Sequence, residues 1–197
     1  MYNRLVRLQG RRAMLVALIP AAVVAAAGPA RADEQLWSLL KGGGQALLMR
    51  HAVTTTGVGD PPGMRLDDCA TQRNLSEEGR RDARRIGETF RARGIPVGRV
   101  MSSPWCRCLE TARLAFGTPE TWAALGNLFG RPARRDDQVR EMRALVGERP
   151  GAGNLVLVSH GSTIVALTDV SLGSGEMVVV TPRGSGRFTV AGRLSAH

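Results

Sequence analysis

Lysine is nearly absent from this 197-residue chain: Lys41 is the single lysine among 27 basic residues, and the others are arginines. The arginines are spread along the chain and mixed with acidic residues, so no basic run predicts a nucleic-acid-binding surface. We therefore expect no nucleic-acid partner. Arginine does bind phosphate oxygens in a bidentate geometry, so this composition is compatible with anionic substrates or negatively charged envelope surfaces.

Cysteine is also scarce, and the three present are Cys69, Cys106 and Cys108. A C-x-C pair with one distant cysteine lacks the usual spacing of zinc ligands, so we expect no metal site. In an exported protein one disulfide is plausible, from Cys69 to either Cys106 or Cys108, because a bridge between the two neighbouring cysteines would strain the local geometry. The alternative is three reduced, buried thiols.

The apolar run at the start of the chain is too short to span a membrane, which needs ~20 residues. It covers residues 13–27, follows four arginines and ends before the small-x-small pattern Ala30-Arg31-Ala32. This order predicts a secretory signal peptide over residues 1–32, with no stable membrane anchor after cleavage. An uncleaved anchor is the alternative, and Arg11-Arg12 also fits a twin-arginine export signal.

Removal of that peptide would leave residues 33–197, a length that suits one domain with one core. Residues 1–32 carry five arginines and no acidic residue, so the net charge would fall from +10 to +5. We expect a periplasmic or secreted protein, and the sequence does not indicate its oligomeric state.

Short apolar runs alternate with amphipathic segments along this domain. Strands are expected over residues 46–49, 97–101, 154–158, 177–180 and 187–190, and helices over residues 33–41, 76–94, 103–116, 136–148 and 163–169. The pattern of residues 117–135 predicts no more than a helical turn or two. Strands that alternate with helices predict an α/β fold, a three-layer α/β/α sandwich with a mostly parallel central sheet.

Capping residues mark two helix starts. Ser76, followed by Glu77 and Glu78, predicts an N-cap with acidic residues in the first turn. Ser103, with Pro104 at the first helical position, predicts another N-cap and puts Arg107 in the first turn of its helix. Residues 54–71 form a long polar loop before the first of these helices, and loops of that length are more often functional than accidental.

Two histidines directly follow predicted strands. The run that begins at Ala46 leads into Arg50-His51, and the run that begins at Leu155 leads into Ser159-His160. Because open α/β sheets bind ligands at the carboxyl ends of their strands, we ask whether His51 and His160 meet there. Two structural histidines are the alternative.

Arginines and a helix start lie beside these histidines in the sequence. Arg50 precedes His51, Arg107 lies in a first helical turn, and a helix follows His160, where free N–H groups favour an anion. Together they would form a site for a phosphoryl group. Taken alone, Arg107 is better explained as a solvated helix arginine.

Four segments resemble the motifs of the histidine phosphatase superfamily, which also contains the cofactor-dependent phosphoglycerate mutases. They fall in the family's order, span about residues 45–164, and are Leu48–Ala52, Leu75–Arg80, Ser102–Ala112 and Val156–Gly161. The resemblance implies a phosphoglycerate mutase-like fold and catalysis through a phosphohistidine, a route that requires no metal or other cofactor.

The resemblance also implies roles for individual residues. His51 matches the histidine that becomes phosphorylated, and Arg50, Arg107 and His160 match the residues that hold the phosphoryl oxygens. The family's usual glycine after the first histidine is Ala52 here. Arg73 is a candidate for a further phosphate contact.

The acid that protonates the leaving group is not evident from the motifs. Glu176, which opens a late strand, is the first candidate. Asp60, Asp67 and Asp68, in the long loop, are the next. Each of them is equally compatible with a solvated or capping role.

These observations predict an exported phosphatase that hydrolyses phosphomonoesters. The chain is small and has no room for a large capping insertion, which leaves an open pocket and favours a substrate presented on something larger, such as a phosphorylated envelope glycan. A small phosphorylated substrate is the other expectation. A phosphate-recognising binding protein without turnover is one alternative, motivated by Ala52 and the unassigned acid. A phosphoglycerate mutase-like phosphotransferase is the other.

Overall fold

The computed structural model describes residues 29–196 of the chain. The predicted signal peptide lies almost entirely outside these residues. Its expected cleavage site after Ala32 falls in the first turn of helix α1, which covers Pro29–Lys41. Within the described part of the chain, no helix has the length and apolar character needed to cross a membrane.

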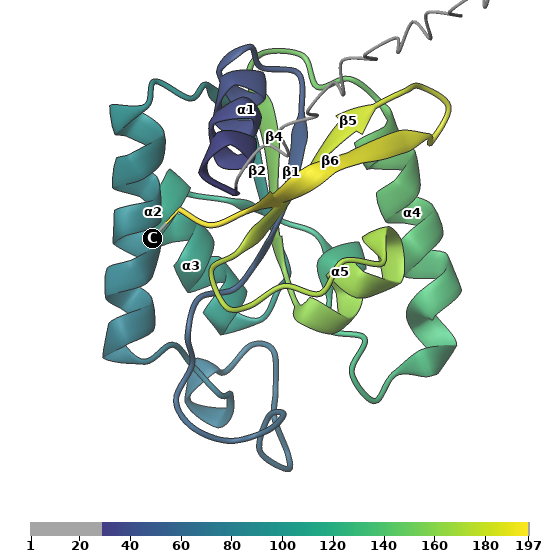
Figure 1. Cartoon of the computed structure of the whole chain (residues 1–197). Helices are drawn as coiled ribbons and strands as arrows, with labels where there is room; N and C mark the ends of the chain where they lie inside the picture. Colours follow the sequence, from purple (N-terminus) through teal and green to yellow (C-terminus); the bar gives the residue numbers. More distant parts are fainter. Residues whose placement is uncertain (1–28, 197) are drawn as a thin grey trace, which may run out of the picture.

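A six-stranded sheet forms the centre of the molecule, in the order β3-β2-β4-β1-β5-β6 (Figure 1). The strands are β1 (Ala46–Arg50), β2 (Val97–Ser102), β3 (Glu120–Thr121), β4 (Asn154–Ser159), β5 (Met177–Pro182) and β6 (Phe188–Leu194). The first four strands of that order are parallel, and β5 and β6 are antiparallel additions at one edge. The prediction of a mostly parallel sheet is confirmed.

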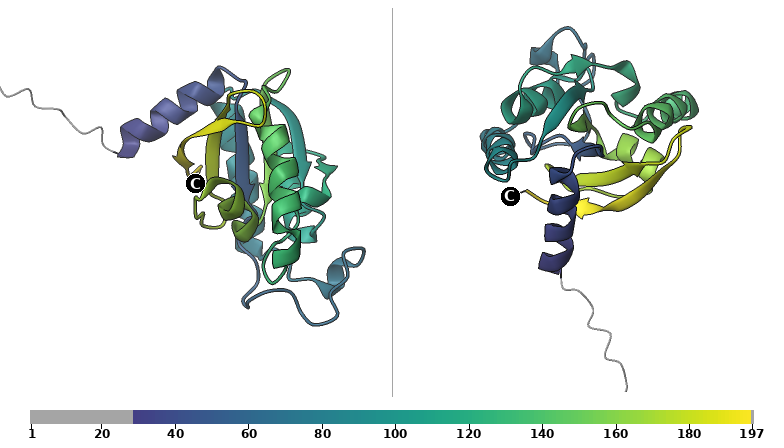
Figure 2. Two further views of the ribbon diagram at one scale, coloured as in Figure 1. Left: turned by 90° about the vertical axis from the view of Figure 1, so that its right-hand side faces the viewer. Right: turned by 90° about the horizontal axis from the view of Figure 1, so that it is seen from above.

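Helices cover both faces of the sheet (Figure 2). Helices α1, α2 (Glu77–Ala92) and α3 (Cys106–Phe116) lie on one face, and α4 (Arg135–Gly147) and α5 (Gly161–Thr168) lie on the other. Successive residues of a strand point to opposite faces, so Leu47 and Met49 pack under the first set of helices while Ala46 and Leu48 pack under the second. Both faces of β1 are therefore buried, as its continuous apolar run predicts.

Helix α2 begins as predicted and packs closely against α3. The Ser76 side chain accepts a hydrogen bond from the backbone N–H of Gly79, which caps the helix. Ile86 and Phe90 enter the core on the face that Ala83 begins. At Gly87 the backbones of α2 and α3 approach so closely that a side-chain Cβ would collide with the carbonyl oxygen of Ala115.

Helix α3 begins later than the sequence predicts, at Cys106, with Trp105 as its N-cap residue. Ser103 does not cap the helix, because its hydroxyl group lies 2.8 Å from Nε2 of His160. Instead the side-chain oxygen of Gln72 accepts a hydrogen bond from the backbone N–H of Cys106. A residue from the long loop thus satisfies the helix start, and Ser103 is left to contact the histidine.

A disulfide joins the same two regions. Cys69 is bonded to Cys106, with the two Cα atoms 5.7 Å apart, so the first of the two predicted pairings is the one present. Cys108 is a free and buried thiol, and burial raises its pKa to about 12. The bridge ties the loop that follows β1, seen below the sheet in Figure 1, to the start of α3.

Candidate active site

The pairing of β1 with β4 brings the two predicted histidines together. The strands are parallel, with Arg50 opposite Ser159, so both chains leave the sheet at the same edge. The backbone N–H of His51 donates to the carbonyl oxygen of Ser159. The imidazole rings of His51 and His160 then meet edge to face, with centroids 5.5 Å apart.

His51 is held as a neutral imidazole. Its Nδ1 lies 2.9 Å from the carbonyl oxygen of Ala52, and because a carbonyl only accepts, Nδ1 carries the proton. Nε2 is therefore left with a free lone pair. Burial is the main cause that lowers the pKa of His51 to about 3, and the charges of nearby arginines add to it, although the bond to Ala52 acts in the opposite direction. The ring is thus uncharged at neutral pH, with the Nε2 lone pair available.

His160 is engaged by the protein at both ring nitrogens. Nη2 of Arg107 lies 3.3 Å from Nδ1, and a guanidinium only donates, so Nδ1 accepts and Nε2 carries the proton. Nε2 then donates to the hydroxyl oxygen of Ser103. Burial first, and then the charge of Arg107, lowers the pKa of His160 well below its usual value. His160 is therefore a fixed, neutral partner of Arg107.

Three arginines surround the histidines, and each is tied to the protein through its terminal nitrogens. Nη1 of Arg50 donates to the Leu172 carbonyl oxygen, and Nη1 of Arg73 donates to the carbonyl oxygen of Gly57 and the Thr54 hydroxyl. Arg107 uses Nη1 and Nη2 toward Asp60. These bonds fix the direction of each guanidinium group.

The Nε–H group of each of these arginines remains buried without a partner. Among the described residues, the buried side-chain nitrogen or oxygen atoms that lack a hydrogen bond are Nε of Arg50, Arg73 and Arg107. An unsatisfied buried donor on a charged group is costly, and native proteins contain few of them. All three of these donors belong to residues around His51 and His160.

A cavity of about 490 Å³ opens over these residues. The three arginines and the two histidines line it, together with Gly161 and Ser162 at the start of α5. Its outer wall is apolar and solvent-exposed, since Val58 is 89% exposed and Phe129 is 63% exposed. The cavity is therefore cationic inside, apolar at its mouth, and larger than a phosphoryl group.

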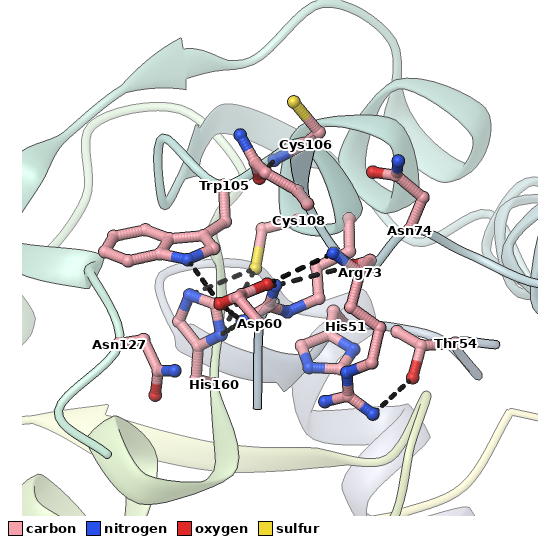
Figure 3. Close-up of polar contacts among 12 residues, drawn as sticks. His51, Thr54, Asp60, Arg73, Asn74, Trp105, Cys106, Cys108, Asn127 and His160 are labelled. Atoms are coloured by element: carbon pink, nitrogen blue, oxygen red, sulfur yellow. Dashed lines mark hydrogen bonds and ion pairs between the residues drawn. The ribbon is translucent and has the colours of Figure 1, made fainter. Parts of the chain in front are cut away.

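Asp60 borders this site: it lines the neighbouring hollow, and its carboxylate bonds Arg107 (Figure 3). Its two oxygens accept hydrogen bonds from Arg107, from Nε1 of Trp105 and from the backbone N–H of Arg73. The Arg107 and Asp60 side chains are 1% and 10% exposed, so the ion pair is nearly dry. In residues 29–196, Asp60 is the one acidic side chain that bonds an arginine of the cavity.

Comparison with known proteins supplies a family for this geometry. The family model described as the histidine phosphatase superfamily (branch 1) matches residues 46–143, which include Arg50, His51, Arg73 and Arg107. The chain belongs to the histidine phosphatase superfamily. The match ends before β4, so His160 is placed by the structure rather than by the family model.

Solved structures share the fold of this histidine phosphatase superfamily member at low sequence identity. The protein histidine phosphatase SixA, complexed with tungstate, is 18% identical with a TM-score of 0.57, over 77% of this chain and 97% of that one. A phosphoserine phosphatase mutant from Entamoeba histolytica is 14% identical with a TM-score of 0.56, over 78% and 98%. The mycobacterial glucosyl-3-phosphoglycerate phosphatase is 20% identical with a TM-score of 0.52, over 74% and 96%. No curated protein matches the chain in sequence.

Ala52 stands where the family usually has glycine, and the structure shows why alanine fits. Among the described residues, the non-glycine residues with positive φ are Asp169 and Ser185, so Ala52 has an ordinary backbone conformation. Its side chain is buried beside Leu75 and Ala83. Its N–H donates to the hydroxyl of Thr111, a contact that the sequence did not reveal.

Glu176, the first candidate for the proton donor, lies outside the cavity lining. Its carboxylate accepts a 2.6 Å hydrogen bond from the backbone N–H of Gly173 and lies 3.8 Å from Nε of Arg193. Its backbone carbonyl accepts from the N–H of Arg50, so Glu176 supports the end of β1 through its main chain.

The other loop acids are also placed. Asp67 is 85% exposed and pairs with Arg65, and Asp68 caps the short helical turn Cys69–Thr71. Of the four acidic candidates, Asp60 is the one whose carboxylate bonds a guanidinium group of the cavity. The remaining contacts that the sequence did not reveal are those of Ser103 and Trp105, although both residues lie within the family motif.

No group of three or more histidine, cysteine, aspartate or glutamate side chains in residues 29–196 is arranged to hold a metal ion. The side chains that line the cavity include three guanidinium groups, which bind anions rather than cations. The site therefore offers a positively charged setting for a phosphoryl group.

Proposed function

We propose that this protein is a phosphatase that hydrolyses phosphomonoesters through a phosphohistidine on His51. The observation that carries the proposal is the convergence of three arginines, Arg50, Arg73 and Arg107, on the cavity that His51 lines. Cationic donors so arranged stabilise the charge that spreads over the equatorial oxygens during phosphoryl transfer.

The reaction uses two displacements at phosphorus. Nε2 of His51 attacks the bound phosphoryl group, the ester bond breaks, and the alcohol leaves. Water then attacks the phosphohistidine and releases inorganic phosphate. Because the imidazole is neutral and its Nδ1 proton is held by Ala52, no proton has to leave Nε2 before the attack.

We further propose that the protein is exported and that its substrate is a small phosphorylated molecule or a phosphorylated envelope glycan. The disulfide between Cys69 and Cys106 supports export, because such bonds persist in oxidising compartments. Structural relatives are described as acting on different phosphates, so their likeness does not select a substrate. Expression of the full chain in a bacterial host, followed by cell fractionation and N-terminal sequencing, tests export; a cytosolic product that begins at Met1 would contradict it.

Phosphoenzyme trapping tests the catalytic proposal. The purified domain is mixed with a ³²P-labelled aryl phosphate and quenched in alkali, which preserves a phosphohistidine, while a matched sample is treated with acid. We expect acid-labile label on the wild type, none on His51→Ala, and unchanged labelling on Arg84→Ala, which removes an exposed arginine of α2. A protein that binds phosphate but neither turns over nor labels would be the non-catalytic alternative.

A further inference from the structure

The proposed reaction still needs an acid that protonates the leaving group. His160 is a poor source of a proton, because its Nε2–H donates to Ser103 and its Nδ1 accepts from Arg107. The Glu176 carboxylate accepts from the backbone N–H of Gly173 and bonds none of the cavity arginines. Asp60 lines the hollow beside the cavity, and its carboxylate bonds directly to Arg107, which lines the cavity itself.

We propose that Asp60 is the acid that protonates the leaving group, and that the phosphoryl group releases it for this role by taking over Arg107. The inference rests on the proposed function and assigns one more catalytic residue to it. Its basis is the position of Arg107, which gives Nη1 and Nη2 to Asp60 and also lines the cavity in which the phosphoryl group is proposed to bind.

The segment that carries Asp60 is built to allow a small movement. Gly57 and Gly59, directly before it, have positive φ, and a Cβ at Gly59 would meet no atom within 4 Å. Val58 between them is almost fully exposed. The segment is held at one side by Arg73, whose Nη1 binds the Gly57 carbonyl oxygen, and at the other by the bonds of Asp60 itself. If Asp60 gives up its hydrogen bonds to Arg107, the segment can therefore move without displacing packed side chains.

The charges that face Asp60 make it respond to the phosphoryl group. Burial raises its pKa, but the hydrogen bond and the charge of Arg107 outweigh burial, so the pKa lies below its usual value. Arg73 contributes through its backbone N–H, and Arg131 lines the neighbouring hollow and covers the ring of Trp105. A phosphoryl group bound to Arg107 would weaken the hydrogen bond and the charge interaction that Arg107 makes with Asp60. It would also place a negative charge beside the carboxylate. Both changes raise the pKa of Asp60.

The proton balance of the two steps is then complete. Asp60 takes a proton from solvent or from the substrate monoanion, since phosphate esters have a second pKa of about 6. Nε2 of His51 bonds to phosphorus as the bond to the ester oxygen breaks, and that oxygen receives the proton of Asp60. The carboxylate next takes a proton from water as the water oxygen attacks phosphorus, and the N–P bond breaks.

Comparison of two leaving groups tests the assignment. kcat/KM is measured for an alkyl phosphate, whose alkoxide needs a proton to leave, and for p-nitrophenyl phosphate, whose phenolate does not. For Asp60→Asn we expect a loss of about 100-fold or more with the alkyl phosphate, a typical contribution of a general acid, and less than about 3-fold with p-nitrophenyl phosphate. With the alkyl phosphate, kcat/KM of wild type is expected to fall at alkaline pH as the acid loses its proton, and this fall should be absent in Asp60→Asn. Asp67→Asn, in the same loop, is the control and should match wild type.

Each other result excludes the assignment. An equal loss with both substrates would show that Asp60 acts only by positioning Arg107, and no loss with either would remove it from the reaction. Thermal melts and the affinity for inorganic phosphate establish that Asp60→Asn is folded and binds an anion. If wild type itself forms no phosphohistidine with p-nitrophenyl phosphate, the proposed function fails, which is a result distinct from failure of the Asp60 role.

Discussion

The side chain of Arg107 lies between Asp60 and His160, with Nη1 2.5 Å from a carboxylate oxygen and Nη2 3.3 Å from Nδ1 of the histidine. One buried guanidinium thereby fixes the tautomer of a neutral imidazole and the position of a loop. The site also holds like charges close together, since the charges of Arg50, Arg73 and Arg107 all lower the pKa of His51. An anion relieves this repulsion, and the first two predictions follow from it.

The stability of the free protein is expected to fall as the pH is lowered from about 6.5 to about 4.5. His51 and His160 have folded-state pKa values far below 6.5, with that of His51 at about 3, so in this window the unfolded chain binds protons that the folded chain does not. Each of the two histidines can then remove up to about 1.4 kcal/mol per pH unit. Urea denaturation at a series of pH values measures the slope. His51→Asn should have a smaller slope than wild type, and equal slopes would contradict the low pKa of His51.

Inorganic phosphate should raise the melting temperature. An anion that binds only the folded state stabilises it by about 2.7 kcal/mol at 100 times its dissociation constant, which corresponds to roughly 5–10 °C for a domain of this size. Scanning calorimetry measures the shift at constant ionic strength. We expect the shift to shrink strongly in Arg73→Ala and Arg107→Ala and to persist in Arg84→Ala. A shift that survives loss of Arg107 would place the anion elsewhere.

Removal of the disulfide should destabilise the protein and weaken phosphate binding. The bond closes a loop between residues 37 apart in sequence, for which chain entropy predicts about 3–4 kcal/mol. It also joins the segment before Arg73 to the residue before Arg107, so its loss frees two arginines that repel each other. Urea denaturation and phosphate titration of Cys69→Ser/Cys106→Ser measure both effects.

The control for the disulfide prediction is the reducing agent itself. Wild type in dithiothreitol should behave as the double variant does, whereas the double variant should not respond to dithiothreitol. An unchanged urea midpoint in the reduced wild type would show that the bridge contributes no stability.

The sequence was sufficient to predict the sheet edge at which the site lies. Apolar strands that end in His51 and His160 must deliver these residues to one edge if the strands are parallel neighbours, and β1 and β4 are. The position of Arg107 in the first turn of a helix follows in the same way from the helix-start residues Ser103 and Pro104. These predictions depend on periodicity and on the geometry of parallel strands, which are properties of short segments.

Contacts between distant segments were not predictable in this way. Ser103 resembles an N-cap in every local respect, yet Gln72 caps the helix and frees Ser103 for His160. Asp60 was one of four acidic candidates because nothing in its neighbourhood distinguishes it. Its pairing with Arg107 spans 47 residues and results from how the disulfide-bonded loop folds back. Residues 117–135 contain a two-residue strand and two short 3₁₀ turns, which leave too little periodicity to detect.

Gly87→Ala should destabilise the protein although alanine is the better helix former. In an exposed helix interior the exchange gains about 1 kcal/mol. Here the new Cβ would collide with the Ala115 carbonyl oxygen of α3, and overpacking that moves backbone costs about 1–3 kcal/mol or more. Because the colliding atom is backbone, α2 and α3 must separate, and we expect a net loss of about 1–2 kcal/mol in urea denaturation.

Gly151→Ala is the matched control for this exchange. Gly151 lies in a turn, and no atom lies within 4 Å of a Cβ added there, so the change should stay within about 0.5 kcal/mol of wild type. Separation of α2 from α3 would also shift the helix that carries Arg107, so Gly87→Ala should bind phosphate more weakly while Gly151→Ala should not. A Gly87→Ala protein that is as stable as wild type would show that the two helices can adjust without cost, and the close contact would then not be what positions Arg107.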